Sequence, residues 1–585
     1  MIKTLAKCIR QAALPAILTP IFVLCESFIE VSIPSVMAKL IDDGITVGNM
    51  DVVIRYGIEL LIRTLIALLF GAIAGYTASR ASSFFSRNVR HDMYYNIQNF
   101  SFSNIDKFSP ASLVTRLTTD VTNVQMSFQM ITRVVFRAPA MLFFAFYFAF
   151  RASPDLSMIF LCVIPFLAVI LALIVRTAFP LFRKVFTTYD DLNNVVEENL
   201  RGIRVVKSFV REEHEIGKFQ KISEKIYNRF TKAEKTVAFN APAMQVSVYT
   251  CIILISWLGA QAVVASGNDE ALGLTTGSLM ELFTYTMQIL MSLMMLSMIF
   301  VMLTMSKASA DRVCEVLNEK SNLRDGERNL TEVKDGSIEF KNVGFRYFKT
   351  SEKAALNNID LKIKSGETIG IIGGTGSSKS TLVQMIPRLY DTDEGEVLVG
   401  GENVRDYNIE ALRNNVAMVL QKNTLFSGTI AENIRWGNEN ATDEEVEKVC
   451  GLACADEFVQ SFPDKYDTYI EQGGTNVSGG QKQRLCIARA LLKKPKILIL
   501  DDSTSAVDTH TDAVIRKAFR EEIPDTTKII IAQRVSSVCD ADRIIIMDDG
   551  RIADMGTHDE LYSRGGIYRE IYDSQTKGAV EEDER

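Results

Sequence analysis

Long apolar runs fill the first half of the chain and are almost absent from the second half. A helix that crosses a membrane needs about 20 predominantly apolar residues. Six runs reach that length, at about 16–38, 56–78, 132–150, 156–178, 244–266 and 279–305. The third and fourth runs are separated only by 151–155, which predicts a tight turn on one side of the membrane and long connections on the other. We therefore expect an all-α membrane domain of six transmembrane helices over residues 1–318.

The distribution of basic residues orients these spans. The long connections 79–131 and 179–240 are rich in Lys and Arg, whereas 42–54 and 267–277 contain neither. Because basic loops stay in the cytoplasm, both long connections and both termini are predicted to be cytoplasmic. The connections also carry the apolar spacing of helices, so we expect the membrane helices to extend well beyond the lipid.

Ionisable residues occur within or near the predicted spans, where isolated charges are costly. They are Glu26, Glu30, Glu59, Arg63, Arg133, Arg137 and Glu281. Most lie near span ends, where snorkelling or pairing between helices accounts for them. Glu26 and Glu30 are one helical turn apart and form the pair of greatest interest.

The last span carries methionines at steps of three and four residues, which places them along one face of a helix. They are Met287, Met291, Met294, Met298, Met302 and Met305. Flexible thioether side chains suit a cavity that accepts varied apolar shapes. Ordinary packing between helices is the alternative interpretation.

Residues 319–336 are polar and lack apolar periodicity, which predicts a linker between domains. Beyond it, short apolar strands alternate with helical stretches. The predicted strands lie at 337–347, 367–372, 395–399, 416–420, 496–500, 528–532 and 543–547. This pattern predicts an α/β domain over residues 337–575, with a parallel core and an antiparallel part. An acidic tail follows at 576–585.

Composition adds three constraints. The net charge of -7 argues against nucleic acid as a partner. Nine scattered cysteines without a CxxC pair indicate buried, reduced thiols and not a disulfide framework or a zinc site. The basic N-terminus precedes an apolar run that lacks a nearby small-residue cleavage site, so we interpret that run as a membrane helix and not as a signal peptide.

A Gly-rich loop follows the predicted strand 367–372. Its residues are Gly373, Gly374, Thr375, Gly376, Ser377, Ser378, Lys379, Ser380 and Thr381. They match a phosphate-binding P-loop except that Ser378 occupies the position of the second glycine. Backbone N–H groups at the start of the following helix favour phosphate, Lys379 would contact the terminal phosphates, and the Ser380 hydroxyl would contact Mg²⁺. For this loop alone, an ordinary Gly-rich turn is a serious alternative.

Two further motifs in the α/β domain also suit the binding of phosphate or Mg²⁺. The apolar strand 496–500 ends in Asp501, a carboxylate suited to the Mg²⁺ shell opposite a P-loop hydroxyl. About twenty residues earlier, the stretch 476–484 has a glycine pair that opens a helix, which is a second anion-binding arrangement. This second site need not serve the same nucleotide as the loop.

The ordered set of motifs resembles the ABC transporter family, as an exporter-type half-transporter in which six membrane helices are fused to one nucleotide-binding domain. The resemblance implies that Tyr347 stacks on adenine and that 373–381 is the Walker A loop. Gln421 would reach Mg²⁺ and water, and Asp501 would end the Walker B strand. ATP and Mg²⁺ are the implied ligands, with Mg²⁺ held by Ser380, Gln421 and Asp501.

Other motifs of the resemblance concern contacts across a dimer. The signature motif corresponds to Val477, Ser478, Gly479, Gly480 and Gln481, and the D-loop to 505–508, which ends in Asp508. Residues 471–474 resemble the exporter X-loop. Residues 198–209 resemble the stretch that leads to the second coupling helix, which docks on the partner's ATPase domain. The first coupling helix would lie near 104–113.

Three positions depart from the family pattern in one site. The catalytic glutamate is Asp502, the switch histidine is Gln533, and a Walker A glycine is Ser378. Asp502 is one methylene shorter than Glu, so a carboxylate that polarises water would fall about 1 Å short, which can cost about 100-fold in rate. Gln533 cannot carry the positive charge of a protonated His. Neutral drift is one interpretation. A site kept for binding and relieved of fast hydrolysis is the one that we favour.

The signature is intact apart from Val477, where the family usually has Leu. In this family each ATP lies between the Walker motifs of one chain and the signature of the other. The resemblance therefore implies a heterodimer, in which this chain binds ATP in a degenerate site and lends its signature to a second half-transporter. The alternatives are a regulatory or channel-like subunit that does not pump, a homodimeric lipid or drug exporter, and an importer subunit, which the fused exporter order disfavours.

The resemblance also favours the plasma membrane of a prokaryote, since no organellar targeting segment precedes the first span. An apolar or amphipathic compound is the expected substrate, because the last span is apolar and rich in methionine. Drugs, lipids and peptides all fit that description.

Overall fold

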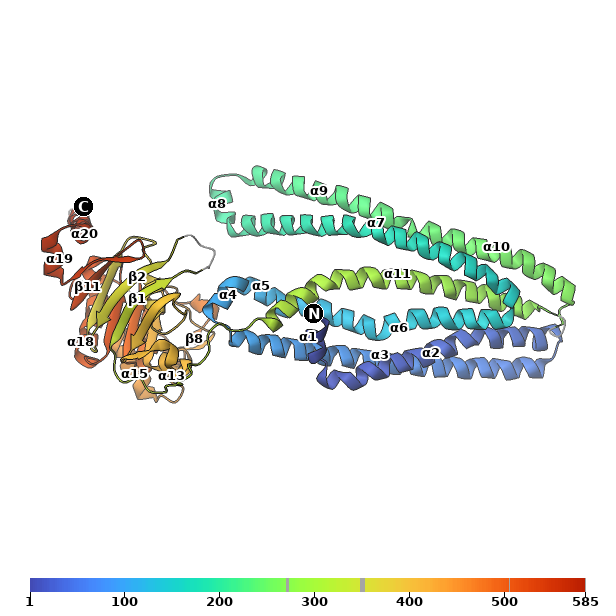
Figure 1. Cartoon of the computed structure of the whole chain (residues 1–585), viewed down its shortest axis with the longest axis horizontal. Helices are drawn as coiled ribbons and strands as arrows, with labels where there is room; N and C mark the ends of the chain where they lie inside the picture. The colour runs from blue at the N-terminus through green and yellow to red at the C-terminus, as the bar shows by residue number, and fades with distance from the viewer. Residues whose placement is uncertain (270–272, 348–352, 504, 584–585) are drawn as a thin grey trace. The chain divides into compact units, whose positions relative to one another are not determined.

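The computed structural model describes residues 1–269, 273–347, 353–503 and 505–583 (Figure 1). It divides into two compact units. The first contains Met1–Asn99 and Ser109–Glu319, and the second contains Phe100–Phe108 and Lys320–Arg585. The short segment Phe100–Phe108 thus belongs to the second unit although the first unit flanks it in sequence.

Six long apolar helices of the first unit confirm the predicted all-α membrane domain (Figure 1). They are α2 (Ala13–Lys39), α3 (Met50–Gln98), α6 (Val121–Ala152), α7 (Pro154–Arg201), α10 (Asn240–Ser266) and α11 (Thr276–Asn318). The 49 residues of α3 span about 73 Å at 1.5 Å per residue, whereas the hydrocarbon core of a bilayer is about 30 Å thick. The predicted extension of the helices beyond the lipid is therefore confirmed.

Local sequence determines where these helices begin. Ser153 caps α7 by accepting a hydrogen bond from the Leu156 N–H, and Pro154 occupies its first turn, which produces the predicted tight turn after α6. Asn49 caps α3 in the same manner, and Thr275 caps α11. Each cap satisfies backbone N–H groups that the first helical turn leaves unpaired.

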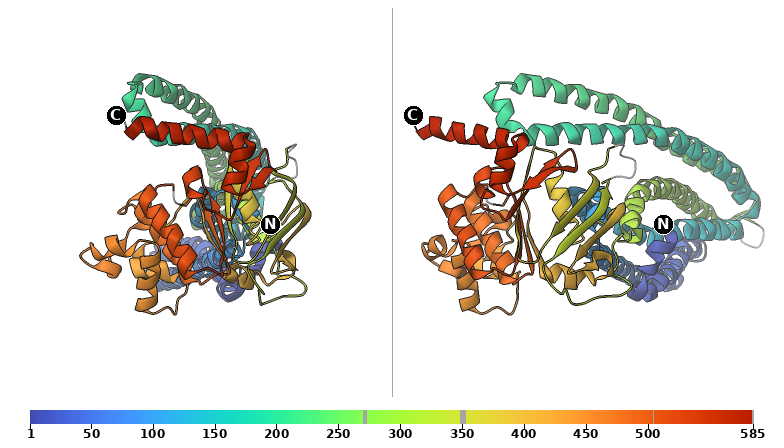
Figure 2. Two further views of the ribbon diagram at one scale, coloured as in Figure 1. Left: turned by 90° about the vertical axis from the view of Figure 1, so that its left-hand side faces the viewer. Right: turned by 60° about the vertical axis from the view of Figure 1, so that its left-hand side comes forward.

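Further helices belong to the same unit. They are α1 (Ile2–Lys7), α5 (Pro110–Thr115), α8 (Ile203–Ser208) and α9 (Glu212–Ala238), with π-helical turns at Leu40–Thr46 and Arg116–Asp120. The helix α9 lies beside α7 in Figure 1 and in the right-hand view of Figure 2. A second group of helices, α2, α3, α6 and α11, packs together. The Tyr285 hydroxyl of α11 donates a hydrogen bond to the Val31 carbonyl of α2 and fixes the register of these two helices.

A six-stranded sheet forms the centre of the second unit, in the order β12-β11-β3-β10-β9-β6. The five strands from β11 to β6 are parallel, and β12 pairs antiparallel at the edge. Their bounds are β3 (Thr368–Gly373), β6 (Val416–Val419), β9 (Ile497–Asp501), β10 (Thr527–Ile531), β11 (Arg543–Asp548) and β12 (Arg551–Gly556). Every residue of β9 and β10 is buried, as in parallel strands that are covered on both faces.

A four-stranded antiparallel sheet packs in the same unit, in the order β2-β1-β4-β5. It contains β1 (Ile338–Phe345), β2 (Leu356–Ile363), β4 (Glu394–Val399) and β5 (Glu402–Asn403), while β7 (Gly428–Thr429) and β8 (Tyr469–Ile470) form a separate pair. The predicted α/β domain with a parallel core and an antiparallel part is confirmed. The sequence pattern missed β2 and β12, because polar residues interrupt both strands and each leaves several positions exposed or half-exposed.

The helices of the second unit cover this sheet or connect its strands. They are α4 (Phe102–Phe108), α12 (Lys379–Gln384), α13 (Ile409–Asn415), α14 (Ile430–Arg435), α15 (Asp443–Leu452), α16 (Asp456–Gln460), α17 (Gly479–Leu492), α18 (Thr509–Glu522), α19 (His558–Arg564) and α20 (Ile567–Asp583). The last helix continues into the segment that the sequence predicts as an acidic tail.

Candidate functional site

The Gly-rich loop joins the buried strand β3 to the helix α12. A Cβ atom at Gly373 would lie 2.1 Å from the Met547 carbonyl oxygen, so only glycine fits between β3 and β11 at this point. Gly376 and Ser378 both have positive φ, at 84° and 70°. Ser378, which replaces the expected glycine, therefore keeps the left-handed backbone that a glycine would adopt without strain.

Lys379 points back across the loop. Its Nζ donates hydrogen bonds to the carbonyl oxygens of Gly373 and Gly374, both at 2.8 Å, and to Ser377 Oγ at 3.3 Å. Partial burial lowers the pKa of Lys379, although Asp501 and Asp502 oppose that shift. The ammonium group is thus held at the centre of the loop, where a phosphate chain needs a cation.

Ser380 and Asp501 meet at the carboxyl end of the parallel sheet. The Ser380 hydroxyl donates a hydrogen bond of 2.9 Å to Asp501 Oδ1, although 121 residues separate them. Asp501 is 3 % exposed, and burial raises the pKa of its carboxyl. A hydroxyl and a carboxylate in contact are oxygen ligands of the kind that Mg²⁺ prefers, so this pair fits the metal that the loop implies.

Asp502 follows Asp501 but has a left-handed backbone, with φ at 49°. Its Oδ2 atom accepts hydrogen bonds from Gln533 Nε2 at 2.7 Å and from Gln421 Nε2 at 3.2 Å. The structure thus brings together Gln421, Asp502 and Gln533, three predicted site residues from separate segments. Two amide donors on one oxygen fix the orientation of this carboxylate.

Tyr347 lies at the other side of the loop. Its hydroxyl is 2.9 Å from Thr381 Oγ1, and its ring is half-exposed. A pocket of about 380 Å³ is lined by Tyr347, Lys353, Ala354, Ala355, Gly376, Ser378, Asp549 and Gly550. It therefore joins the predicted adenine-stacking residue to the Gly-rich loop.

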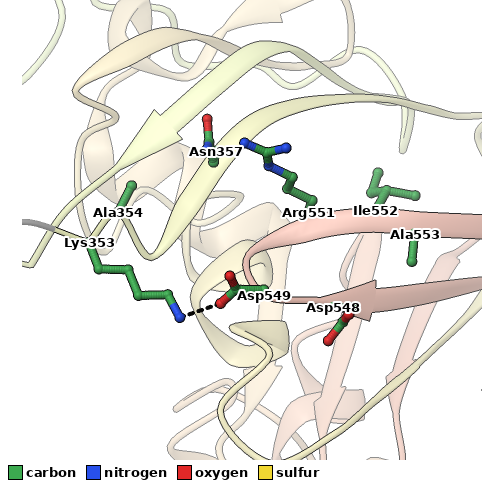
Figure 3. A pocket seen from close by; sticks show the side chains of 8 residues that line it. All are labelled: Lys353, Ala354, Asn357, Asp548, Asp549, Arg551, Ile552 and Ala553. Carbon is green, nitrogen blue, oxygen red and sulfur yellow. Dashed lines mark ion pairs between the residues drawn. The ribbon is translucent and has the colours of Figure 1, made fainter.

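A second pocket of about 620 Å³ adjoins the first and shares Lys353, Ala354 and Asp549 with it (Figure 3). Its other lining residues come from β2 and from the hairpin of β11 and β12: Asn357, Asp548, Arg551, Ile552 and Ala553. Lys353 and Asp549 form an ion pair at the boundary between the two pockets. The pocket beside the Gly-rich loop thus opens on this side into a polar groove.

Tyr390 connects this region to the segment α4, and the sequence did not single it out. Its hydroxyl donates a hydrogen bond of 2.7 Å to the Asp106 carboxylate, and its ring packs edge-on against Phe102. The same ring lies 5.4 Å from the Tyr347 ring, centroid to centroid. No motif or spacing in the sequence could have identified Tyr390, because its partners lie more than 40 residues away along the chain.

The predicted signature residues form a separate site at the start of α17. Ser478 caps this helix, since its Oγ accepts from the Gln481 N–H while the Gln481 side chain accepts from the Ser478 N–H. A Cβ atom at Gly480 would lie 2.8 Å from the Ala506 carbonyl oxygen. Free N–H groups at the N-terminus of a 14-residue helix favour an anion.

The predicted D-loop packs against this helix. Gln483 Oε1 accepts a hydrogen bond of 3.0 Å from the Ala506 N–H, and Gln483 is 5 % exposed. Asp508 caps α18 by accepting from the Thr511 N–H, which lowers the pKa of its carboxyl. Val477 is buried. Gln483 lies within the stretch 476–484, but the sequence does not indicate a role for it. Its burial against the D-loop is visible only in the tertiary structure.

The predicted coupling segments adopt short helices. Residues 104–113 fall on α4 and the start of α5, and 198–209 contain the end of α7 and all of α8. The tip after α8 exposes Phe209 and Val210, at 72 % and 80 %. In the X-loop stretch, the Thr475 hydroxyl donates to the Glu471 carboxylate and stabilises the turn that precedes the signature.

Comparisons with known proteins agree with these features. The family described as ABC transporter transmembrane region matches residues 16–293, and the family described as ABC transporter matches residues 356–505. An uncharacterized ABC transporter ATP-binding protein of Bacillus subtilis, YfiB, is 37% identical over 95% of both chains. An ATP-dependent lipid A-core flippase of Pseudoalteromonas translucida is 32% identical over 91% of this chain and 90% of the flippase.

A solved structure supports the same fold. A bacterial Atm1-family ABC exporter with ATP bound superposes with a TM-score of 0.81 and 23% identity, and the match covers 97% of this chain and 98% of that chain. The chain therefore belongs to the ABC transporter family, as an exporter-type half-transporter with a membrane domain fused to its ATPase domain.

Proposed function

We propose that this chain is one half of a heterodimeric exporter, that its own ATP site binds nucleotide with slow or no turnover, and that its signature completes the catalytic site of the partner. The observation that carries the proposal is the Asp502 carboxylate. It stands where the family has its catalytic glutamate, and both Gln421 and Gln533 donate to one of its oxygens.

The binding half of the site supports nucleotide retention. Lys379 lies across the Gly-rich loop, and Ser380 is bonded to Asp501. Lys379 would hold the terminal phosphates of ATP, and Ser380, Gln421 and Asp501 would hold Mg²⁺. When bound, Mg²⁺ would neutralise charge on the phosphates. In this proposal the chain's own residues position the phosphates and Mg²⁺. The site has Asp502 in place of the family's catalytic glutamate.

The signature half supports a role across the dimer. Ser478, Gly479 and Gly480 keep the residue types of the family, and the start of α17 offers N–H groups to an anion. Within the described residues, no hydrogen bond joins these three residues to the loop 373–381. A signature that serves a second chain's nucleotide fits this arrangement.

The membrane setting is part of the same proposal. Six helices are long and apolar enough to span a bilayer. Basic residues in the two long connections favour cytoplasmic N- and C-termini. The bacterial relatives favour the plasma membrane of a prokaryote. An apolar or amphipathic substrate fits the exposed methionines of α11, namely Met287, Met291, Met294 and Met298. Met302 is half-buried, and the side chain of Met305 lies outside the described part of the structure.

The experiment compares ATP turnover by this chain purified alone with turnover by the chain co-purified with a partner half-transporter. We expect little turnover alone and robust turnover in the pair, with ATP still bound by the chain alone. Lys379→Ala should abolish that binding. Robust turnover by the chain alone, lost in Lys379→Ala, would establish an active homodimer instead. Nucleotide binding without ATP-driven substrate movement by the pair would establish a regulatory subunit.

A further inference from the structure

Two helices of the membrane domain that pack against each other carry four charged residues within the predicted spans. Glu26 and Glu30 come from α2, and Arg133 and Arg137 come from α6. Arg137 bridges the two acids, because its Nη1 donates to Glu26 Oε1 and its Nη2 donates to Glu30 Oε2 at 2.7 Å. We refer to these four residues as the charged cluster.

The charged cluster is not internally satisfied. Glu26 is 8 % exposed, yet its Oε2 atom has no hydrogen-bond partner among the described residues. Arg133, one turn before Arg137, is half-buried and forms no ion pair within the part of the chain that the structure describes. A buried polar atom without a partner costs free energy, so an unmatched carboxylate oxygen is an unusual feature inside a membrane domain.

The backbone of α3 is shaped to accommodate these side chains. A Cβ atom at Gly71 would lie 2.9 Å from Glu26 Oε1, whereas one at Gly75 would lie 3.7 Å from Arg133 Nη1. The two glycines are one helical turn apart, so α3 passes over both a carboxylate and a guanidinium group. A Cβ atom at Gly71 would therefore displace the Glu26 carboxylate, whereas one at Gly75 would make only an ordinary van der Waals contact.

The charges of the cluster decide what it can bind. Two carboxylates and two guanidinium groups sum to zero, so a ligand with a single charge would leave a group of the same sign unmatched. A ligand with both charges would match both. In charge, an ammonium group would complement the buried, partnerless Oε2 of Glu26 and the half-buried Glu30. A phosphate would complement Arg133, whose guanidinium fork suits phosphate oxygens.

We propose that the charged cluster binds the zwitterionic headgroup of an amphiphilic substrate, with the ammonium group at Glu26 and Glu30 and the phosphate at Arg133. Arg137 is a positioning residue, since it holds the two carboxylates one turn apart. This inference rests on the proposed export function, because it names the substrate class of that exporter.

The test measures equilibrium binding without nucleotide, so that it does not depend on pumping. The full-length chain, in complex with its partner, is titrated in detergent with three acyl-chain-labelled lipids: phosphatidylethanolamine, phosphatidylglycerol and a trimethylammonium lipid. We expect phosphatidylethanolamine to bind about tenfold more tightly than either singly charged lipid, as expected for loss of one charged contact. Equal binding of the three lipids, or binding of none, would overturn the proposal.

The two half-buried members of the charged cluster, Glu30 and Arg133, supply the variants. Arg133→Gln should shift the preference toward the cationic lipid, and Glu30→Gln should shift it toward the anionic lipid. These opposite shifts separate direct recognition from a general loss of structure, and unchanged preference in both variants would contradict the headgroup site. Gly71→Ala should weaken phosphatidylethanolamine binding, whereas the matched control Gly75→Ala should leave it unchanged.

ATP-driven movement of the same lipids in proteoliposomes is measured separately. Selective binding without ATP-driven movement would refute export while leaving the headgroup site intact. Movement of unrelated cargo by a pair that binds the three lipids equally would refute the headgroup site alone.

Discussion

The two nucleotide-facing regions of the ATPase domain differ in which residues have changed. On the side of the Gly-rich loop, Lys379, Ser380 and Asp501 are retained, Ser378 replaces a glycine, and the positions for catalysis carry Asp502 and Gln533. On the side of the signature, Ser478, Gly479 and Gly480 are all present. Substitution in the loop region thus falls mainly on the positions of the catalytic groups, whereas in the signature only Val477 departs from the usual Leu.

The local structures sharpen that difference. Asp502 accepts two amide hydrogen bonds and has a left-handed backbone, so its orientation is fixed by Gln421 and Gln533. The start of α17 is instead capped by its own Ser478 and packed on the D-loop through Gly480 and Gln483. One region holds a carboxylate in a fixed orientation, and the other caps and packs the start of a helix whose N–H groups favour an anion.

The largest effect is expected on the signature side. In Gly480→Ala, the new Cβ would lie 2.8 Å from the Ala506 carbonyl oxygen and displace the D-loop or the start of α17. We expect ATP turnover of the assembled pair to fall about 100-fold, as a displacement of about 1 Å can cause. Steady-state phosphate release measures it. Gly451→Ala on α15 is the matched control, because a Cβ there meets nothing within 4 Å. Turnover within twofold of wild type in Gly480→Ala would remove the signature from the mechanism.

A smaller effect of opposite sign is expected on the loop side. The double variant Asp502→Glu with Gln533→His restores a longer carboxylate and a group that can carry a proton. With the partner's own site inactivated, we expect turnover to rise about tenfold or more, since a positioned general base contributes about 100-fold or more. Adding Lys379→Ala to the same protein should abolish the gain. If the double variant stays as slow as wild type, Asp502 and Gln533 are not what limits this site.

The metal-binding part of the loop side predicts a dependence on pH. Burial raises the pKa of Asp501, so its carboxyl becomes protonated at a higher pH than the usual value of about 3.9. Mg²⁺ needs the ionised form. The Mg²⁺-dependent part of ATP affinity should therefore decline as the pH is lowered toward that raised pKa, and it should be present in full above it.

Isothermal titration with ATP, with and without Mg²⁺, measures this profile. Asp501→Asn should weaken the Mg²⁺-dependent affinity about tenfold and flatten its pH profile. Asp508→Asn is the control, because the Thr511 N–H lowers the pKa of Asp508 and moves its titration away from the same range. A profile that remains in Asp501→Asn would assign the titration to another group.

Much of this architecture could be predicted from the sequence. Apolar runs of about 20 residues identify the six long helices, because a segment in lipid needs apolar side chains. Such a segment is helical because its backbone polar groups must form hydrogen bonds with one another. The strands β9 and β10 are predictable because both faces are buried and both strands are continuously apolar. The strands β2 and β12 are not, since exposed faces admit Asn and Asp within β2 and Arg and Asp within β12.

The contacts between distant segments could not be predicted. Spacing indicates that Ser380 and Asp501 belong to one chemistry, but only the sheet order places β3 and β9 on either side of β10. Gln421 and Gln533 both donate hydrogen bonds to one oxygen of Asp502, and this depends on side-chain orientation. The same is true of Glu26 and Glu30, whose spacing suggested a pair but not the bridging Arg137.

Near the Gly-rich loop, Tyr390 also connects the ATPase domain to α4. The Tyr390 hydroxyl binds the Asp106 carboxylate of α4 while its ring packs on Tyr347. Tyr390→Phe removes the hydrogen bond and preserves the ring. We expect hydrogen exchange of α4 to accelerate about fivefold, the equivalent of about 1 kcal/mol.

The matched control for that experiment is Tyr407→Phe, which removes a buried hydroxyl that donates to the Val399 carbonyl. It should lower the stability of the ATPase domain without a selective change in α4. Equal acceleration of α4 in both variants would mean that Tyr390 stabilises the domain only in a general manner.

The smallest effect concerns Ser378, the serine in the position of the Walker A glycine. Its φ of 70° is strained for a residue with a Cβ atom, so Ser378→Gly should relieve about 1 kcal/mol and raise the melting temperature of the ATPase domain. Ser377→Gly is the contrast, because Ser377 lacks a positive φ and its Oγ accepts from Lys379, so its loss should be destabilising. Unchanged ATP affinity in the more stable Ser378→Gly would mean that the serine leaves phosphate binding intact. The slow turnover that we propose would then depend on Asp502 and Gln533 alone.

A lower melting temperature of Ser378→Gly would contradict the strain. It would mean that the serine side chain makes a stabilising contact in the loop.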